Sequence, residues 1–226
     1  MRRQIAGAAF LLIAAATAAS AQPYVGKPRP RAGIVEGGAG AVWIRGYGAG
    51  DASALETANT TTGTPPITLF ATSSSVRSAA GGEGRLGVYV TRRVLVEGFF
   101  QYSRPSLETR VSQDYENAQA VTADVPVASY LAGGTALYHF GDGQLVPFVG
   151  GGAAYVRQLY DGNSVMVTGS EFHALGGVKY WFGGRVRHFG LRVDAGVSSR
   201  SKSVGFEDKR RVLPTLSGGI TYLFGK

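Results

Sequence analysis

Apolar and polar residues alternate with a period of two through most of the chain. The clearest block spans residues 189–200, where every charged side chain falls on one set of alternate positions and the other set is almost wholly apolar. Residues 171–182 and 216–224 repeat this pattern. Because successive side chains of a strand point to opposite sides, the pattern predicts strands with one uncharged face and an all-β fold.

Alternation in the remaining sequence predicts five further strands, near residues 33–47, 76–91, 94–110, 121–140 and 145–160. The blocks at 33–47 and 145–160 are rich in glycine, and the sequence leaves open which of their faces is apolar. With the three blocks above, the chain is expected to form eight strands.

The predicted connections alternate in length. Short ones fall at about 91–93, 141–144 and 183–188, and longer ones at about 48–75, 111–120, 161–168 and 201–211. The first long connection contains the polar segment 60–66 and is expected to be a loop. This alternation is typical of an antiparallel transmembrane β-barrel with short periplasmic turns and longer extracellular loops.

The first residues have the pattern of an export signal. Arg2 and Arg3 precede an apolar run from Ile5 to Ala19, and Ala19-Ser20-Ala21 resembles a cleavage site. We therefore expect a signal peptide at 1–21, rather than a membrane anchor, and one barrel domain at 22–226 in the cell outer membrane. The chain has no cysteine, which excludes disulfides and thiolate metal sites.

A soluble, lipocalin-like barrel would also show eight alternating strands, so the position of the aromatic residues matters. Aromatic side chains of the apolar face gather beside the short turns and near residue 224, which predicts a girdle at one membrane interface. These residues are Tyr138, Phe140, Tyr180, Phe182, Phe189, Tyr222 and Phe224.

The formal charge of +8 raises the question of nucleic acid. Many of the basic residues, however, lie in the N-terminal segment and the short turns, which would place them at one rim of the barrel. That distribution favours anionic lipid headgroups over nucleic acid. The expected partners are outer-membrane lipids and lipopolysaccharide, the outer-membrane assembly machinery during insertion, and a surface ligand.

Four charged residues are predicted to point into the barrel. Glu97, Lys179 and Arg192 each lie a few residues from a short turn, and Asp194 lies one inward step further. Buried charges are tolerated when they are paired, so we expect a polar network in the lumen. Eight strands leave a lumen that side chains can fill, which argues against an open pore.

No catalytic, cofactor-binding or metal-binding residue is assigned. Glu171 and His173 share a face and could form an acid–base pair, but a structural hydrogen bond inside the barrel is the favoured interpretation. The glycine clusters at 37–40, 81–84 and 150–152 lack the lysine and hydroxyl residue of a phosphate-binding loop.

Two motifs carry a family resemblance. With the N-terminal leader, Gly-Leu-Arg-Val-Asp-Ala-Gly at 190–196 and Gly-Gly-Ile-Thr-Tyr-Leu-Phe at 218–224 resemble the small OmpA/OmpX-type, or opacity-like, outer-membrane barrels. The resemblance implies a non-enzymatic protein that supports envelope integrity or surface contacts through its external loops. A small-solute channel and a lipid A-modifying enzyme are the alternatives.

The last long loop is rich in cations that could contact lipopolysaccharide phosphates, although ordinary solvation of a loop would also explain them. These residues are Arg200, Lys202, Lys209, Arg210 and Arg211.

Overall fold

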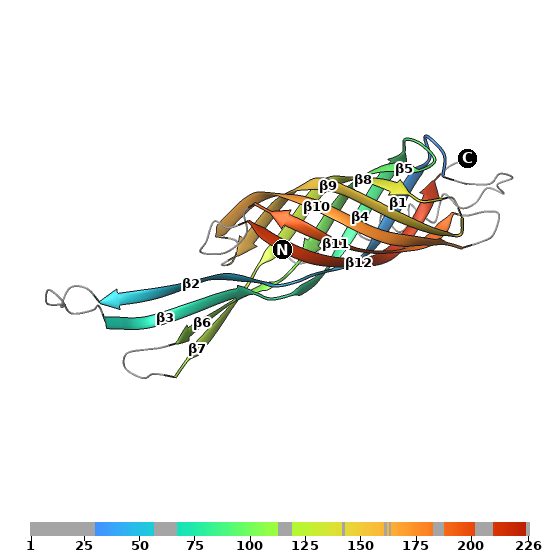
Figure 1. The fold of residues 1–226 in the computed structure, drawn as a ribbon. Coiled ribbons are helices and arrows are strands. Elements are labelled where there is room, and N and C mark those ends of the chain that lie inside the picture. The colour runs from blue at the N-terminus through green and yellow to red at the C-terminus, as the bar shows by residue number, and fades with distance from the viewer. Residues whose placement is uncertain are drawn as a thin grey trace.

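The computed structural model describes residues 30–56, 67–112, 119–141, 143–160, 162, 164–182, 188–201 and 210–224. These residues form twelve β-strands in two antiparallel sheets (Figure 1). No helix in the described ranges is long and apolar enough to cross a bilayer. The predicted signal peptide lies outside them.

Eight of the strands close into a barrel, which confirms the predicted architecture. Closure is made by β1, which pairs with β12 on one side and with β4 on the other. A closed sheet satisfies its backbone hydrogen bonds internally and has no free edge. The barrel strands are β1 (Val35–Ile44), β4 (Ala79–Tyr89), β5 (Val94–Ser103), β8 (Ala128–His139), β9 (Leu145–Tyr160), β10 (Val165–Trp181), β11 (Phe189–Arg200) and β12 (Arg211–Phe224).

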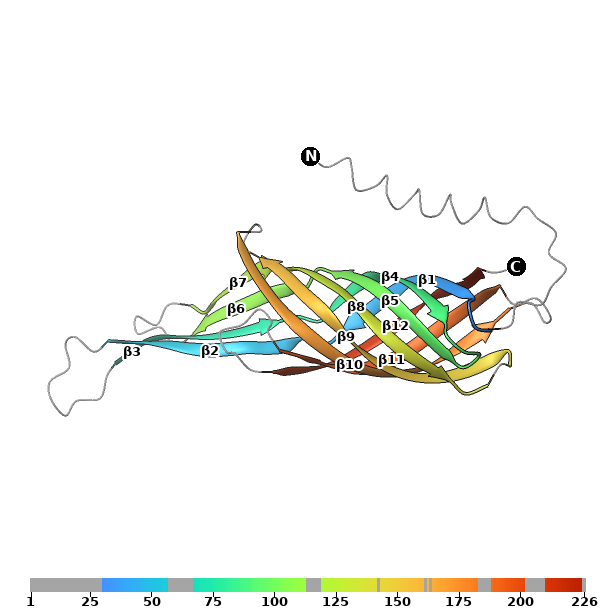
Figure 2. The ribbon, with the colours of Figure 1, turned by 90° about the horizontal axis from the view of Figure 1, so that it is seen from above.

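The other four strands form a sheet that projects from one end of the barrel (Figures 1 and 2). Each continues a barrel strand after a break of one or two residues, so the sheet extends the side of the barrel made by β1, β4, β5 and β8. Its strands pair in the order β2-β3-β6-β7. They are β2 (Tyr47–Glu56), β3 (Ile67–Val76), β6 (Ser106–Ser112) and β7 (Val121–Pro126).

This sheet corrects the sequence prediction. Much of the expected loop at 48–75 is the β2–β3 hairpin, and the expected strands at 94–110 and 121–140 are each divided in two. The pairing of β2 with β3 contains two register shifts, near Gly48 and Ala54, which disturb the period-two pattern on which strand prediction depends. Pro105 lacks an N–H group and lies at the break between β5 and β6. Residues 57–66 and 113–118 fall outside the described residues.

The barrel strands direct apolar side chains outward and charged ones inward. Leu191 and Val193 are 44% and 56% exposed, whereas Arg192 and Asp194 are 5% and 6% exposed. The structure also shows which face of each of the two glycine-rich blocks points outward. In β1, Glu36 and Val42 point inward and Trp43 outward; in β9, the even-numbered residues 146 and 148 are buried and their neighbours 145, 147 and 149 are exposed.

The predicted aromatic girdle forms at the end of the barrel opposite the sheet, where the short turns lie. Ring contacts link Tyr180 to Phe182 and Phe182 to Phe189, with centroids 5.1 and 5.7 Å apart. Tyr222 and Phe224 make a similar contact at the end of β12, at 4.9 Å.

Candidate functional site

The barrel interior begins with an apolar floor at the short-turn end. The rings of Phe148 and Trp181 are each 1% exposed there and pack within a cluster contributed by most of the barrel strands. The full cluster comprises Ile34, Tyr89, Leu95, Leu137, Val146, Phe148, Trp181 and Leu223. Dense packing of this kind closes the lumen on the turn side.

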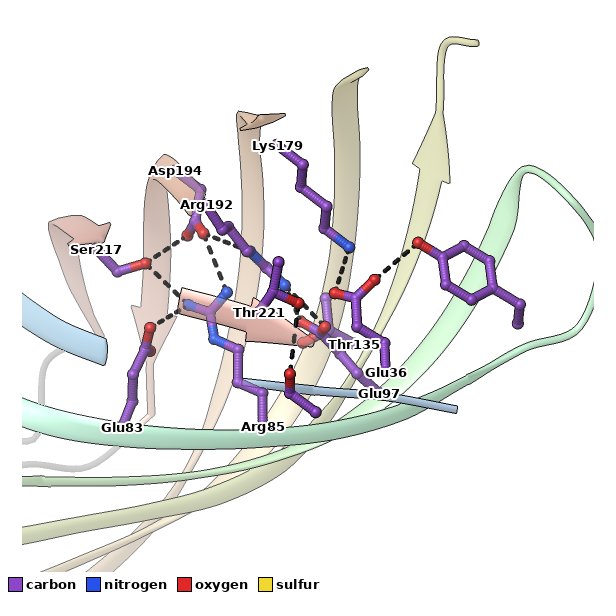
Figure 3. A network of polar contacts seen from close by, with 12 residues as sticks. Glu36, Glu83, Arg85, Glu97, Thr135, Lys179, Arg192, Asp194, Ser217 and Thr221 are labelled. Carbon is purple, nitrogen blue, oxygen red and sulfur yellow. Dashed lines mark hydrogen bonds and ion pairs between the residues drawn. The ribbon is translucent and has the colours of Figure 1, made fainter. Parts of the chain in front are cut away.

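A layer of charged side chains lies directly beyond this floor (Figure 3). Arg192 on β11 donates through Nη1 to both carboxylate oxygens of Glu97 on β5, at 2.8 and 3.1 Å. Its Nε donates to Oδ2 of Asp194 at 2.8 Å. Arg192 therefore joins Glu97 and Asp194, two of the other residues predicted to lie in the lumen.

Asp194 connects this group to a second arginine, on β4. Arg85 donates through Nη1 to Asp194 Oδ2 at 3.0 Å, and its Nη2 lies 2.7 Å from Glu83 Oε1. Ser217 on β12 donates to Asp194 Oδ1 and accepts from Arg85 Nη2, both at 2.9 Å. The Asp194 carboxylate is thus shared by two guanidinium groups and a hydroxyl.

Lys179 belongs to a neighbouring group. It lies opposite Arg192 in the register of β10 and β11, but its Nζ donates to Glu36 Oε1 on β1, at 2.6 Å. Tyr89 donates to the second oxygen of Glu36 at 2.8 Å. The Phe148 ring contacts both groups, with its centroid 5.6 Å from Lys179 Nζ and 4.8 Å from the Arg192 guanidinium carbon. The four predicted residues therefore form two adjacent ion-pair groups.

The two groups together tie β1, β4, β5, β10, β11 and β12 across the lumen. They contain three cations and four carboxyl groups, and each cation has at least one carboxylate partner. Side chains from opposite walls thus occupy the lumen at this depth (Figure 3). On the sheet side of this layer lies a cavity of about 60 Å³, room for one or two water molecules.

Glu171 and His173 line this cavity but engage different partners. Glu171 accepts two hydrogen bonds from Arg200, at 2.7 and 3.0 Å. His173 Nε2 lies 2.9 Å from the hydroxyl of Thr135. Neither side chain orients the other, so the acid–base pair considered from the sequence does not form in this structure.

The placement of Arg200 also corrects a prediction about the last loop. Arg200 is 3% exposed and points into the barrel, so the prediction that it contacts lipopolysaccharide at the surface is wrong. Alternation along β11 gives it the same facing as Arg192 and Asp194. Arg211 is half-buried, with its guanidinium 5.1 Å from the Tyr47 ring, and Arg210 is exposed. Lys202 and Lys209 fall outside the described residues.

Sequence reasoning missed Glu36, Glu83 and Arg85. A signal for the last two was present, because residues 83, 85, 87 and 89 alternate with Gly82, Gly84, Leu86 and Val88, which places charge on one face only. Glu36 had no such signal, since the next inward positions of β1 are Gly38 and Gly40, and Val42 and Ile44 beyond them are apolar. Among the described residues, no cluster of three or more acidic, histidine or cysteine side chains could hold a metal ion.

A closed barrel with an apolar outer wall, an aromatic girdle and charges hidden in its lumen defines a class of membrane-spanning β-barrel. The chain belongs to the outer membrane protein beta-barrel domain family, whose profile matches residues 8–221. The protein is therefore an outer-membrane barrel. In such barrels the short turns face the periplasm, so the projecting sheet lies on the extracellular side.

Two solved structures are similar to this chain at low sequence identity. The outer membrane protein OprG from Pseudomonas aeruginosa superposes with a TM-score of 0.58 and 12% identity, over 87% of this chain and 98% of OprG. The attachment invasion locus protein Ail of Yersinia pestis gives a TM-score of 0.45 and 13% identity, over 85% of this chain and 99% of Ail. No curated protein sequence matches the chain.

Proposed function

We propose that the protein is a non-enzymatic outer-membrane barrel that presents the β2-β3-β6-β7 sheet for contacts at the cell surface. The observation that carries this proposal is the sheet itself, which extends four barrel strands beyond the barrel (Figure 1). The filled lumen supports an anchoring role for the barrel rather than transport through it.

The exposed side chains of the sheet support a binding role. Leu55, Ile67 and Phe70 are between 42% and 49% exposed near the far end of the β2–β3 hairpin, and Val121 on β7 is 63% exposed. These residues extend outside the membrane-spanning barrel, where exposed apolar groups mark interaction surfaces when they gather. Among the described strands, β2 and β7 are paired on one side only, so each offers an edge for strand addition.

An ion pair supports the base of the sheet. Arg77, at the β3–β4 break, donates through Nε to Glu108 on β6. This hydrogen bond, together with the charge of Arg77, holds the pKa of the Glu108 carboxyl below its ordinary value. Arg77 is exposed and Glu108 is partly exposed, so the pair orients the sheet more than it stabilises the protein.

The test replaces residues 48–75 and 106–126 with short glycine-containing turns in a strain deleted for the native gene. We expect the shortened barrel to insert and to keep heat-modifiable gel mobility, because closure depends on the eight barrel strands. We expect cells carrying the intact protein to adhere to polystyrene and to sibling cells, and cells carrying the shortened barrel to lose this adhesion. Retention of both properties would contradict the proposal.

Point substitutions test whether the exposed side chains of the sheet contribute to adhesion in addition to its backbone edges. Phe70→Thr and Val121→Thr remove exposed apolar area and keep residues that favour strands. Val212→Thr is the matched control, because Val212 is 68% exposed but lies on β12 of the barrel. Only the two sheet substitutions should weaken adhesion.

The same deletion strain tests the role in envelope integrity. If the shortened barrel restores full detergent resistance to this strain, the barrel supports envelope integrity without the sheet.

A further inference from the structure

The outer wall of the barrel carries a groove that neither the lumen nor the projecting sheet explains. It crosses β5, β8 and β9 and has a volume of about 360 Å³. Its lining combines three aromatic side chains with two leucines, one alanine and one arginine, namely Phe100, Tyr130, Tyr155, Leu131, Leu159, Ala132 and Arg157.

The strand register explains why the wall is hollow here. Ala132 on β8 pairs with Phe100 on β5 and with Tyr155 on β9, and all three side chains point outward. A methyl group thus lies between two large rings, which are 53% and 55% exposed. The alanine forms the floor and the rings form the sides of a channel about as wide as one strand.

Arg157 lies near the extracellular end of this groove, where only Leu159 of the lining is further along β9. In the register it pairs with Tyr130, one outward step beyond the row of Ala132. Counted from Leu145 at the short-turn end of β9, Arg157 is roughly 30 Å along the barrel axis at the usual strand rise and tilt. The apolar band of such barrels is about 25 Å tall. Arg157 is therefore at the level of the headgroups of the outer leaflet.

Arg157 is exposed, and its guanidinium group forms no ion pair or side-chain hydrogen bond with any residue in the described ranges. This distinguishes it from Arg85, Arg192 and Arg200, which point inward and bind carboxylates. A guanidinium group forms two parallel hydrogen bonds to a phosphate group, and the aromatic sides of the groove suit a hydrocarbon chain. Charge and shape are thus complementary to one amphiphile that carries a phosphate above an acyl chain.

We propose that this groove binds the lipid A part of lipopolysaccharide. An acyl chain lies over Ala132 between Phe100 and Tyr155, and a phosphate of the glucosamine headgroup binds Arg157. Lipid A occupies the outer leaflet, at the height of Arg157, whereas phospholipid phosphate would reach the same groove only if phospholipid entered that leaflet.

The experiment titrates the protein, purified from outer membranes and held in dodecyl maltoside micelles, with bisphosphorylated lipid A and, separately, with phosphatidylglycerol. Native mass spectrometry reports the bound fraction. We expect Arg157→Gln to weaken lipid A binding about tenfold, because it removes the charge-assisted bonds to phosphate. Ala132→Leu should weaken binding as well by filling the floor of the groove.

Two control variants test whether the effect is local. Arg110→Gln removes an exposed cation on β6 of the projecting sheet, and Ala195→Leu enlarges an outward alanine on β11, remote from the groove. Both should bind lipid A like the unchanged protein. Equal binding by Arg157→Gln and the unchanged protein would overturn the proposal, as would equal affinity for phosphatidylglycerol or an equal loss in Arg110→Gln. Heat-modifiable gel mobility establishes whether each variant is folded. If Ala132→Leu does not fold, the comparison of Arg157→Gln with the unchanged protein still tests the proposal.

Discussion

Lys179 is fully buried inside the barrel, and its ammonium group reaches one carboxylate, that of Glu36 on the opposite wall. Removing a charge from water costs several kcal/mol, and the attraction between close partners offsets much of that cost. The pair therefore makes little net contribution while intact. Loss of one partner is a different matter, because it leaves the other charge buried and uncompensated.

This asymmetry leads to a prediction about the pair. Lys179→Met should lower the free energy of unfolding by about 3–5 kcal/mol, since Glu36 then keeps hydrogen bonds from neutral hydroxyl groups, such as that of Tyr89, but loses its ion-pair partner. The double variant Glu36→Gln/Lys179→Met should recover most of that loss. Urea-induced unfolding in lipid vesicles measures both changes. A double variant no more stable than the single one would show that the ion pair is not the source of the effect.

At the scale of elements, neighbouring strands approach most closely where glycine faces the lumen. Gly177 on β10 lies opposite Asp194 on β11. A Cβ atom on Gly177 would overlap the carbonyl oxygen of Val193 and lie 2.6 Å from Asp194 Cβ. The adjacent Gly176 faces outward, and a Cβ there would make ordinary contacts at 3.6 and 3.7 Å.

Two neighbouring glycines therefore provide a matched test of strand packing. Gly177→Ala should destabilise the barrel by about 1–3 kcal/mol, because β10 and β11 must move apart and disturb the ion pairs of Asp194. Gly176→Ala should change stability by no more than about 0.5 kcal/mol. The same unfolding assay measures both variants. Equal effects of the two substitutions would rule out close strand approach as the cause.

At the scale of the whole molecule, the apolar floor and the charge layer act as two successive closures of one lumen. The floor packs rings such as Phe148 and Trp181 against each other, and the charge layer joins opposite walls. A dissolved ion would have to displace both. The small-solute channel, an alternative from the sequence, requires such a path.

We accordingly expect the unchanged protein to give no discrete conductance steps in planar lipid bilayers. Combining Phe148→Ala and Trp181→Ala with Arg192→Ala removes large side chains from both closures and should produce steps. Single-channel recording of the two proteins in parallel makes the comparison. Steps of similar size and frequency from the unchanged protein would mean that the lumen opens, and the channel alternative would then replace the anchoring role.

The sequence by itself determined the barrel, its strand number and the facing of its most regular strands. The physical reason is local: consecutive strand residues point to opposite sides, so Arg192 and Asp194 could be placed inside from neighbouring residues alone. The same rule failed where glycine or small residues made both faces alike, as around Glu36, and where register shifts disturbed the β2–β3 hairpin.

Only the tertiary structure decided which groups meet. Glu36 and Lys179 are 143 positions apart, and their contact follows from the register of every strand between them around the barrel. The groove beside Ala132 likewise depends on which residues of β5 and β9 lie across from it. Alternation along one strand carries no information about its neighbours. The ion-pair partners, the projecting sheet and the outer groove therefore follow only from how the strands pair.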